Sequence, residues 1–131
     1  MAAGSMNNTL LVVDDEEGFG TFVAEVAEGL DYKTRVTTNG REFIKAFKAE
    51  KPSVVVMDVV MPGMDGVELA GWLAEQEFDG HVVVVTGYAP LYADLIASQS
   101  VAKGMKSVTK LLKPLRAKAL RAALTFDDGA D

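Results

Sequence analysis

Polar side chains suited to phosphoryl chemistry directly follow the apolar runs of this sequence. Asp14 and Asp15 follow the first run, Asp58 the second, Thr86 the third and Lys113 the last. Clustered carboxylates repel one another unless a cation lies among them, and Mg²⁺ suits this place because it prefers oxygen ligands. A carboxylate can also act as a nucleophile and form an aspartyl phosphate. Phosphoryl transfer requires that phosphate oxygens be positioned and neutralised, which a metal ion, a lysine and a threonine hydroxyl can do together.

The acids differ in their placement along the chain. Asp58 stands alone at the end of its run and precedes a loop rich in Pro and Gly, so it has room to receive a phosphoryl group. Asp14 and Asp15 are adjacent, with Glu16 after them, and this pair is better placed to hold a metal. We therefore interpret Asp58 as the candidate nucleophile and the pair as candidate metal ligands.

Apolar runs and helical patterns alternate along the chain. Continuous apolar runs predict buried strands at 10–13, 54–57, 82–85 and 108–112. Looser alternation predicts a less buried strand at 32–38. Apolar spacing predicts helices around 19–30, 43–47, 67–73, 91–102 and 115–124. Such alternation indicates an α/β fold with a parallel sheet covered on both faces. Ligands bind beyond the carboxyl ends of such strands, so the polar side chains should converge on one crevice.

Composition narrows the class of protein. The 131 residues fit one domain, and the absence of cysteine excludes disulfides, thiolate metal sites and cysteine nucleophiles. No apolar run approaches the ~20 residues of a membrane helix, and no signal peptide is visible. A net charge of −6 argues against nucleic-acid binding, which usually relies on a basic face. We expect a cytoplasmic domain that contacts neither nucleic acid nor membrane.

Basic residues concentrate near the C-terminus. They are Lys103, Lys106, Lys110, Lys113, Arg116, Lys118 and Arg121. Solvated helix faces and loops explain such a cluster, and so does a docking surface for an acidic partner. At the two ends, residues 1–5 look like an expression scar and residues 126–131 like a loose acidic tail, which leaves a single domain at 6–125.

Four motifs resemble those of the response-regulator receiver family of two-component signalling. They are Val12–Glu16, Met57–Gly66, Val84–Gly87 and Leu112–Pro114. The run from Asp58 to Gly66 is a specific signature, and the resemblance spans nearly the whole chain. It implies a flavodoxin-like, doubly wound sheet of five strands in the order 2-1-3-4-5. It also implies a phosphoacceptor domain in phosphorelay signal transduction rather than an enzyme.

The family's site residues carry over onto matching positions. Asp58 resembles the phosphoacceptor. Asp15 resembles a direct Mg²⁺ ligand, Asp14 a ligand that acts mainly through water, and the backbone carbonyl of Val60 a further ligand, with Mn²⁺ able to replace Mg²⁺. Thr86 resembles the hydroxyl that moves to bond the phosphoryl group.

The lysine and its surroundings both match and depart from the family pattern. Lys113 resembles the lysine that pairs with a phosphate oxygen, and Pro114 follows it in what is often a cis peptide. The family usually places an aromatic ring three residues before this lysine, where this chain has Lys110. Tyr88 is the nearest aromatic residue that could replace that ring, and a surface tyrosine without a switching role explains it equally well. Thr86, Tyr88 and Lys110 are therefore the switch candidates.

The resemblance also implies partners. A sensor histidine kinase or phosphotransfer protein would supply the phosphoryl group, and an output domain or effector protein would respond to it. Homodimers of the family often form through the fourth helix, fifth strand and fifth helix, the surface to which Lys110 belongs. Val60 and Tyr88 occupy positions that influence the attacking water and are poorly suited to orient it, so we expect slow self-dephosphorylation.

Two other functions remain open. A Mg²⁺-dependent phosphohydrolase with an aspartyl nucleophile typically has a second aspartate two residues further on, whereas this chain has Val60 there. A receiver-like module that binds partners without being phosphorylated usually lacks part of the acidic set or the lysine, and this chain keeps both.

His81 is the only histidine. A phosphodonor histidine would lie exposed on a helix, whereas His81 follows Asp79 and Gly80 at the start of a predicted strand. We expect it to be a solvent-facing loop residue.

Overall fold

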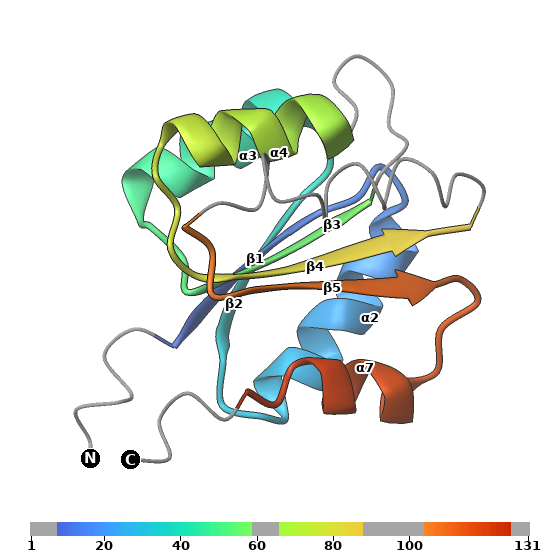
Figure 1. The fold of residues 1–131 in the computed structure, drawn as a ribbon. Coiled ribbons are helices and arrows are strands. Elements are labelled where there is room, and N and C mark those ends of the chain that lie inside the picture. The colour runs from blue at the N-terminus through green and yellow to red at the C-terminus, as the bar shows by residue number, and fades with distance from the viewer. Residues whose placement is uncertain (1–7, 59–65, 88–103, 127–131) are drawn as a thin grey trace.

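The structure of the chain is a computed structural model that describes residues 8–58, 66–87 and 104–126. Within these residues, five strands form one parallel sheet in the order β2-β1-β3-β4-β5 (Figure 1). They are β1 (Thr9–Val13), β2 (Lys33–Thr37), β3 (Val54–Asp58), β4 (His81–Thr86) and β5 (Ser107–Leu112). The predicted α/β class and strand order are confirmed.

Helices cover both faces of the sheet. They are α2 (Glu17–Glu28), α3 (Gly40–Ala49), α4 (Gly66–Glu75) and α7 (Ala117–Ala123). Figure 1 shows α3 and α4 on one face, with α2 and α7 on the other, which is the expected doubly wound arrangement. The helix predicted around 91–102 lies outside the described residues. No helix in the described part of the chain has the length and apolarity needed to cross a bilayer.

Two layers of apolar side chains flank the sheet because successive strand residues point to opposite faces. Leu10 and Val12 of β1 pack with α2 and α7, whereas Leu11 and Val13 pack with α3 and α4. The residues of β3 and β4 alternate in the same way, so these central strands are buried on both faces and read as continuous apolar runs. The edge strand β2 is largely exposed, as its looser pattern predicted.

Helix α3 begins with two side-chain-to-backbone hydrogen bonds. Asn39 Oδ1 accepts a hydrogen bond from the N–H of Glu42 at 2.8 Å, and Glu42 Oε1 accepts one from the N–H of Thr38 at 3.0 Å. The first of these bonds satisfies a donor that the start of a helix leaves unpaired, and the second fixes the chain just before it. Asn39 is therefore the residue that caps the start of α3.

Gly20 allows α2 to approach the edge strand closely. A Cβ atom at Gly20 would lie 2.6 Å from Cγ1 of Val36 in β2. This separation is well below van der Waals contact, so a larger residue would require a shift of the helix or of Val36. Close packing here fixes the first turns of α2, which directly follow the end of β1.

The expectation for His81 is wrong. His81 is the first residue of β4 and only 8% exposed. Its Nδ1 lies 2.6 Å from Oγ of Ser107, and its ring stacks on Phe126 with the centroids 3.7 Å apart. The error arose because the stacking partner lies 45 positions further along the chain, beyond any local pattern. Phe126, which we assigned to the loose tail, is packed, whereas residues 1–7 and 127–131 lie outside the described residues.

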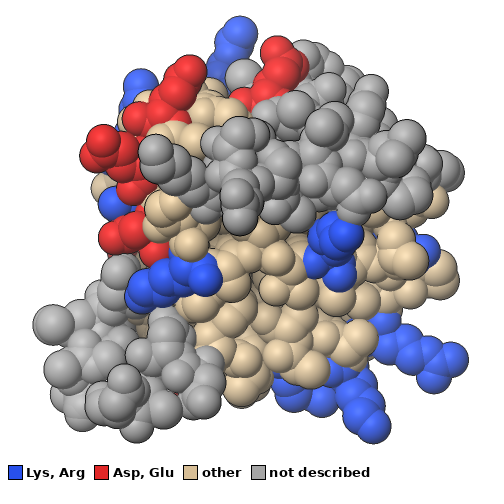
Figure 2. Space-filling view, in the orientation of Figure 1, with Lys and Arg blue, Asp and Glu red and all other residues tan. Residues whose placement is uncertain are grey.

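The basic residues near the C-terminus lie on and beside β5 and α7. The exposed ones are Lys106, Lys110, Arg116, Lys118 and Arg121. Figure 2 shows Lys and Arg side chains projecting from the part of this face where β5 and α7 lie in Figure 1. Exposure agrees with a solvated surface and with a docking surface alike.

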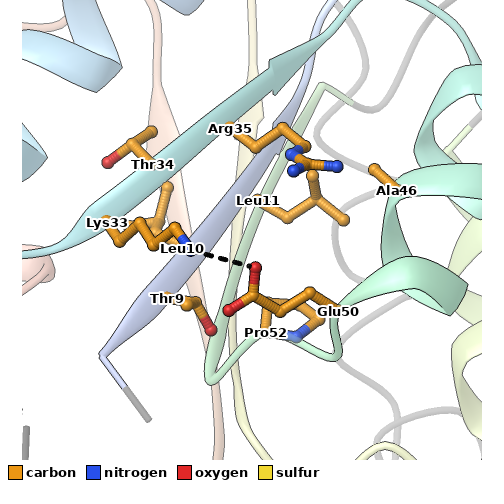
Figure 3. Close-up of a pocket in the computed structure, with 9 residues that line it drawn as sticks. All are labelled: Thr9, Leu10, Leu11, Lys33, Thr34, Arg35, Ala46, Glu50 and Pro52. Carbon is orange, nitrogen blue, oxygen red and sulfur yellow. Dashed lines mark hydrogen bonds and ion pairs between the residues drawn. The ribbon is translucent and has the colours of Figure 1, made fainter. Parts of the chain in front are cut away.

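A small hollow lies between α3 and the starts of β1 and β2. Its volume is about 100 Å³, and the ion pair between Lys33 Nζ and Glu50 Oε1, at 3.4 Å, crosses it (Figure 3). The side chains of Arg35 and Leu11 point toward α3, and that of Thr34 points away from it. None of the side chains predicted to do chemistry lines this hollow.

Candidate functional site

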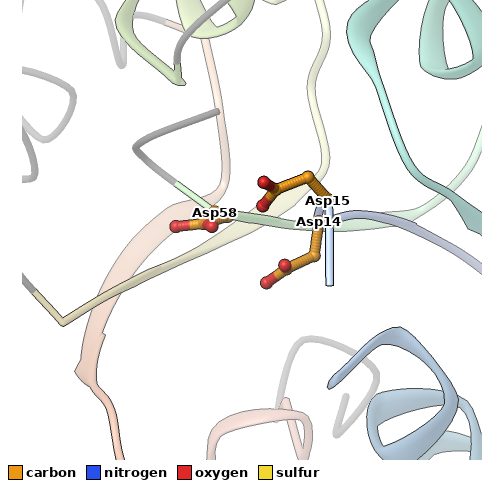
Figure 4. Close-up of side chains that lie close together, drawn as sticks. All are labelled: Asp14, Asp15 and Asp58. Atoms are coloured by element: carbon orange, nitrogen blue, oxygen red, sulfur yellow. The ribbon is translucent and has the colours of Figure 1, made fainter. Parts of the chain in front are cut away.

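The carboxyl ends of β1 and β3 bring three aspartates together. The register places Val13 beside Met57, so Asp14 and Asp58, which follow them, lie level on neighbouring strands. Asp14, Asp15 and Asp58 each offer a carboxylate oxygen, and these oxygens lie within 4.8 Å of one another. Figure 4 shows the three side chains projecting to the same side of the strand ends. The acids therefore converge, as their positions after the apolar runs predict.

The three carboxylates differ in exposure. Asp14 is completely buried and Asp58 is 8% exposed, whereas Asp15 faces solvent. Asp14 Oδ1 accepts a hydrogen bond from the N–H of Glu16 at 2.8 Å, which fixes that carboxylate. Two carboxylates buried side by side destabilise the fold unless positive charge compensates them.

Lys113 supplies part of that positive charge from just beyond the end of β5. Its Nζ lies 3.1 Å from Asp14 Oδ2 and 3.0 Å from Glu16 Oε1. The distance from the same nitrogen to Asp58 Oδ2 is 3.8 Å. One ammonium thus contacts acids from β3 and from the loop after β1.

The pKa values of Asp14 and Lys113 show how far these charges compensate each other. Burial raises the pKa of Asp14 above its ordinary value, and the Glu16 N–H and the Lys113 ammonium oppose this only in part. Burial by itself lowers the pKa of Lys113, but hydrogen bonds with Glu16 and Asp14 and the nearby negative charges raise it overall. A fully compensating partner would return the pKa of its acid to the ordinary value. The ammonium therefore does not offset the whole effect of burying Asp14.

The crevice suits a hard divalent cation. Mg²⁺ takes oxygen ligands, usually from one or two carboxylates together with water. The three carboxylate oxygens are close enough to share one ion, and exposed Asp15 leaves one side open to water. Added positive charge would also relieve the incompletely compensated burial of Asp14. The donor set thus fits Mg²⁺.

Thr86 ends β4 on the other side of Asp58. Asp58 is level with Val85, so Thr86 is the next residue beyond it, and its side chain is 1% exposed. The carbonyl of Thr86 accepts a hydrogen bond from the backbone N–H of Lys113 at 2.9 Å. The peptide between Lys113 and Pro114 is cis, as the resemblance implied. Thr86 and Lys113 are therefore held together at the ends of neighbouring strands.

The roles assigned to the site residues all stay predictions, and the structure gives least on three of them. Val60 and Tyr88 lie outside the described residues. Lys110 is exposed on β5, level with Val84 of β4 and three residues before Lys113. This places Lys110 within the strand that leads to the crevice, and its part in a switch is untested.

Sequence reasoning missed two neighbours of the lysine. The Lys113 Nζ lies 4.4 Å from the centroid of the Phe19 ring, in the first turn of α2. The sequence pattern places Phe19 only at the start of the helix predicted around 19–30, and Glu16 only beside the aspartate pair. Both follow the aspartate pair by a few residues, but their contact with a lysine about a hundred positions away depends on how α2 packs.

The chain belongs to the response regulator receiver domain family, whose model matches residues 10–125. It is a receiver domain of the kind found in two-component and chemotaxis response regulators. This family consists of phosphoacceptor signalling domains.

Curated relatives differ in how much of their length the chain covers. It is 29% identical over 119 residues to the sporulation initiation phosphotransferase F of Bacillus subtilis, covering 91% of this chain and 92% of that protein. It is 28% identical to a chemotaxis protein CheY of Listeria monocytogenes, covering 88% and 93%. It is 35% identical over 81 residues to the alkaline phosphatase synthesis transcriptional regulatory protein PhoP of Bacillus subtilis, of which it covers only 34%.

Solved structures share the fold. A response regulator protein from Burkholderia pseudomallei, with a phosphorylated aspartic acid, calcium ion and citrate, is 29% identical with a TM-score of 0.72, covering 94% of this chain and 69% of that one. A CheY-like receiver domain protein from Methanospirillum hungatei has a TM-score of 0.75 at 21% identity, covering 89% and 90%. The second likeness bears on the fold alone.

Proposed function

We propose that this domain accepts a phosphoryl group on Asp58 from a histidine kinase or a phosphotransfer protein, with Mg²⁺ held beside it. The observation that carries the proposal is the convergence of Asp14, Asp15 and Asp58 within 4.8 Å, with the Lys113 Nζ 3.8 Å from Asp58 Oδ2. Membership of a family of phosphoacceptor domains supports it. The phosphorylated aspartic acid in the relative from Burkholderia pseudomallei gives further support.

In the proposed step, a carboxylate oxygen of Asp58 attacks the phosphorus of a phosphohistidine on the donor protein. A P–O bond forms, the P–N bond breaks, and the electron pair of that bond stays on the imidazole nitrogen. Lys113 pairs with one phosphoryl oxygen, and the Thr86 hydroxyl donates a hydrogen bond to another. Bound Mg²⁺ would supply positive charge against the remaining oxygen charge.

The metal ligands follow from the same arrangement. Asp15 is exposed and would bind Mg²⁺ directly, together with Asp58, whereas buried Asp14 would act mainly through a water molecule. The carbonyl of Val60 completes the proposed ligand set. The poorly water-orienting side chains at Val60 and Tyr88 support slow loss of the phosphoryl group, and phosphorylation would change contacts with a partner or an output domain.

Acetyl phosphate provides the direct test, since it can donate a phosphoryl group without a partner protein. We would incubate the chain with acetyl phosphate in the presence and absence of Mg²⁺ and measure the intact mass. We expect a gain of one phosphoryl group that requires Mg²⁺ and disappears in Asp58→Asn. The matched control is Asp79→Asn, an exposed aspartate that pairs with Lys51 at 3.8 Å and should be modified like the wild type.

The possible results separate the functions. No mass gain, when a known receiver is modified alongside, would contradict the proposal and favour a module that binds partners without phosphorylation. A gain that persists in Asp58→Asn would place the modification elsewhere and contradict the role of Asp58.

A further inference from the structure

The Lys113 ammonium has neighbours of two kinds. Asp14 and Asp58 belong to the proposed phosphoryl site, and they lie 3.1 and 3.8 Å from Nζ. Glu16 and Phe19 do not, yet Glu16 is the shortest ion-pair partner at 3.0 Å and the Phe19 ring centroid lies 4.4 Å away. The second pair therefore influences where the ammonium rests before any phosphoryl group arrives.

The Phe19 ring is a well-fixed neighbour. A cation over the face of an aromatic ring is attracted to the negative potential of that face, at distances below about 6 Å. Phe19 is partly buried against the core beneath α2 and contacts the Phe22 ring at 5.9 Å between centroids. The close approach of Gly20 to Val36 also holds this turn against the sheet. The ring can keep its place while the lysine changes partners.

Glu16 is a more easily exchanged neighbour. Its side chain is 69% exposed, whereas that of Asp14 is buried. Ion pairs at such exposure are weak and are screened by salt. The ammonium can therefore leave Glu16 at little free-energy cost when a more highly charged partner appears nearby, such as a phosphoryl group on Asp58.

We propose that Phe19 and Glu16 are positioning residues for Lys113. Phe19 keeps the ammonium at the mouth of the crevice in both states, and Glu16 holds it only in the unphosphorylated state. On phosphorylation, the ammonium exchanges Glu16 for a phosphoryl oxygen without leaving the ring. The exchange breaks no covalent bond, and the inference rests on the proposed function of Asp58.

The first test needs no phosphorylation. Protons close to the face of a ring resonate upfield, so the Lys113 Hε signals should be shifted upfield in the ¹H–¹³C NMR spectrum of the wild type. Phe19→Leu should remove this shift, whereas Phe19→Tyr, which keeps the ring face, should retain it. Phe22→Leu, which loses a ring from the same helix, is the matched control and should retain the shift.

The second test measures the rate of phosphorylation by acetyl phosphate. Phe19→Leu should slow the reaction by up to about fivefold, because an ammonium that the ring no longer holds in place must be positioned during the reaction, while Phe19→Tyr should keep most of the wild-type rate. Glu16→Gln should speed it about threefold at low salt and make the rate less dependent on salt, since a screened competitor has been removed. Glu17→Gln, the exposed neighbour, should do neither.

Several outcomes would overturn the inference. An unshifted Lys113 signal in the wild type would show that the ammonium does not lie over the ring. Equal slowing by Phe19→Leu and Phe19→Tyr would show that Phe19 has only a packing role. Identical salt dependence of Glu16→Gln and the wild type would show that Glu16 does not position the lysine. If the wild type took up no phosphoryl group, the proposed function would fail, and the NMR test would still decide whether Phe19 holds the lysine.

Discussion

Asp14 combines complete burial with a charge that its neighbours compensate only in part. One oxygen is fixed by the Glu16 N–H and the other contacts the Lys113 ammonium. Without a metal, the ionised carboxylate therefore opposes folding, although the proposed function requires it. Stability and function place opposite demands on this residue, as is common at functional sites.

We expect Asp14→Asn to raise the free energy of unfolding at neutral pH without divalent ions, by up to about 1 kcal/mol, the usual scale of a single substitution. Asparagine keeps the acceptor for the Glu16 N–H but carries no charge. The pKa of Asp14 is raised in the folded state, so protonation of this carboxyl stabilises the folded wild type. That stabilisation is complete below the ordinary pKa of 3.8 and is lost as the pH rises through the folded-state pKa. Urea unfolding should therefore show that the free energy of unfolding of Asp14→Asn exceeds that of the wild type by an amount that grows with pH.

The control for this measurement is Asp79→Asn, which removes an exposed carboxylate. It should change the free energy of unfolding little at any pH. A loss of stability in Asp14→Asn at neutral pH would contradict the view that Lys113 leaves this charge incompletely compensated.

At the scale of elements, α2 contains two glycines in different surroundings. A Cβ atom at Gly18 would meet nothing within 4 Å, whereas one at Gly20 would lie 2.6 Å from Val36 Cγ1. Gly18→Ala should therefore raise the free energy of unfolding by about 0.5–1 kcal/mol through helix propensity alone. Gly20→Ala should lower it by about 1 kcal/mol, since α2 or the Val36 side chain must shift to make room.

Thermal and urea unfolding of the two variants would check this pair. Each substitution is the same chemical change, made two residues apart on one helix, so the difference isolates the contact with β2. Equal stabilisation by both alanines would mean that Val36 moves aside freely and that the helix is not held there.

Much of the element level could be predicted from local patterns. The buried strands read as continuous apolar runs because helices cover both faces, and the ends of those runs located Asp14, Asp58, Thr86 and Lys113. The contact of Lys113 with Phe19 could not be predicted, because it depends on how α2 packs against the sheet. The burial of His81 could not be predicted either, because its stacking partner, Phe126, follows α7 in the chain and meets His81 only in the folded structure.

At the scale of the whole molecule, the candidate site exists only when the chain is folded. Its side chains come from the ends of β1, β3, β4 and β5, so an unfolded chain does not bring them together. Mg²⁺ should therefore raise the free energy of unfolding, by about 1.4 kcal/mol at ten times its dissociation constant. Scanning calorimetry at constant ionic strength would measure the accompanying rise in Tm.

Asp15→Asn should reduce this rise, since Asp15 is a proposed direct ligand. The matched control is Asp31→Asn, at a backbone φ of 70° that asparagine also tolerates, and it should respond to Mg²⁺ like the wild type. Equal rises in all three proteins would point to binding outside the acidic crevice.

The pairing of β4 and β5 sets the relative position of the Thr86 and Lys113 side chains at the carboxyl ends of these strands. Both strands have six residues, and they run in step from the His81–Ser107 pair to the Thr86–Leu112 pair, and the Phe126 ring stacks on His81 at the first of these pairs. One residue inserted into β5 would carry the ammonium about 3.3 Å past the hydroxyl and turn it to the opposite face of the sheet. The relative position of the Lys113 ammonium and the Thr86 hydroxyl therefore depends on the two strands having equal length. A change of register at the start of β4 or β5 would displace the lysine from the acids by the same amount.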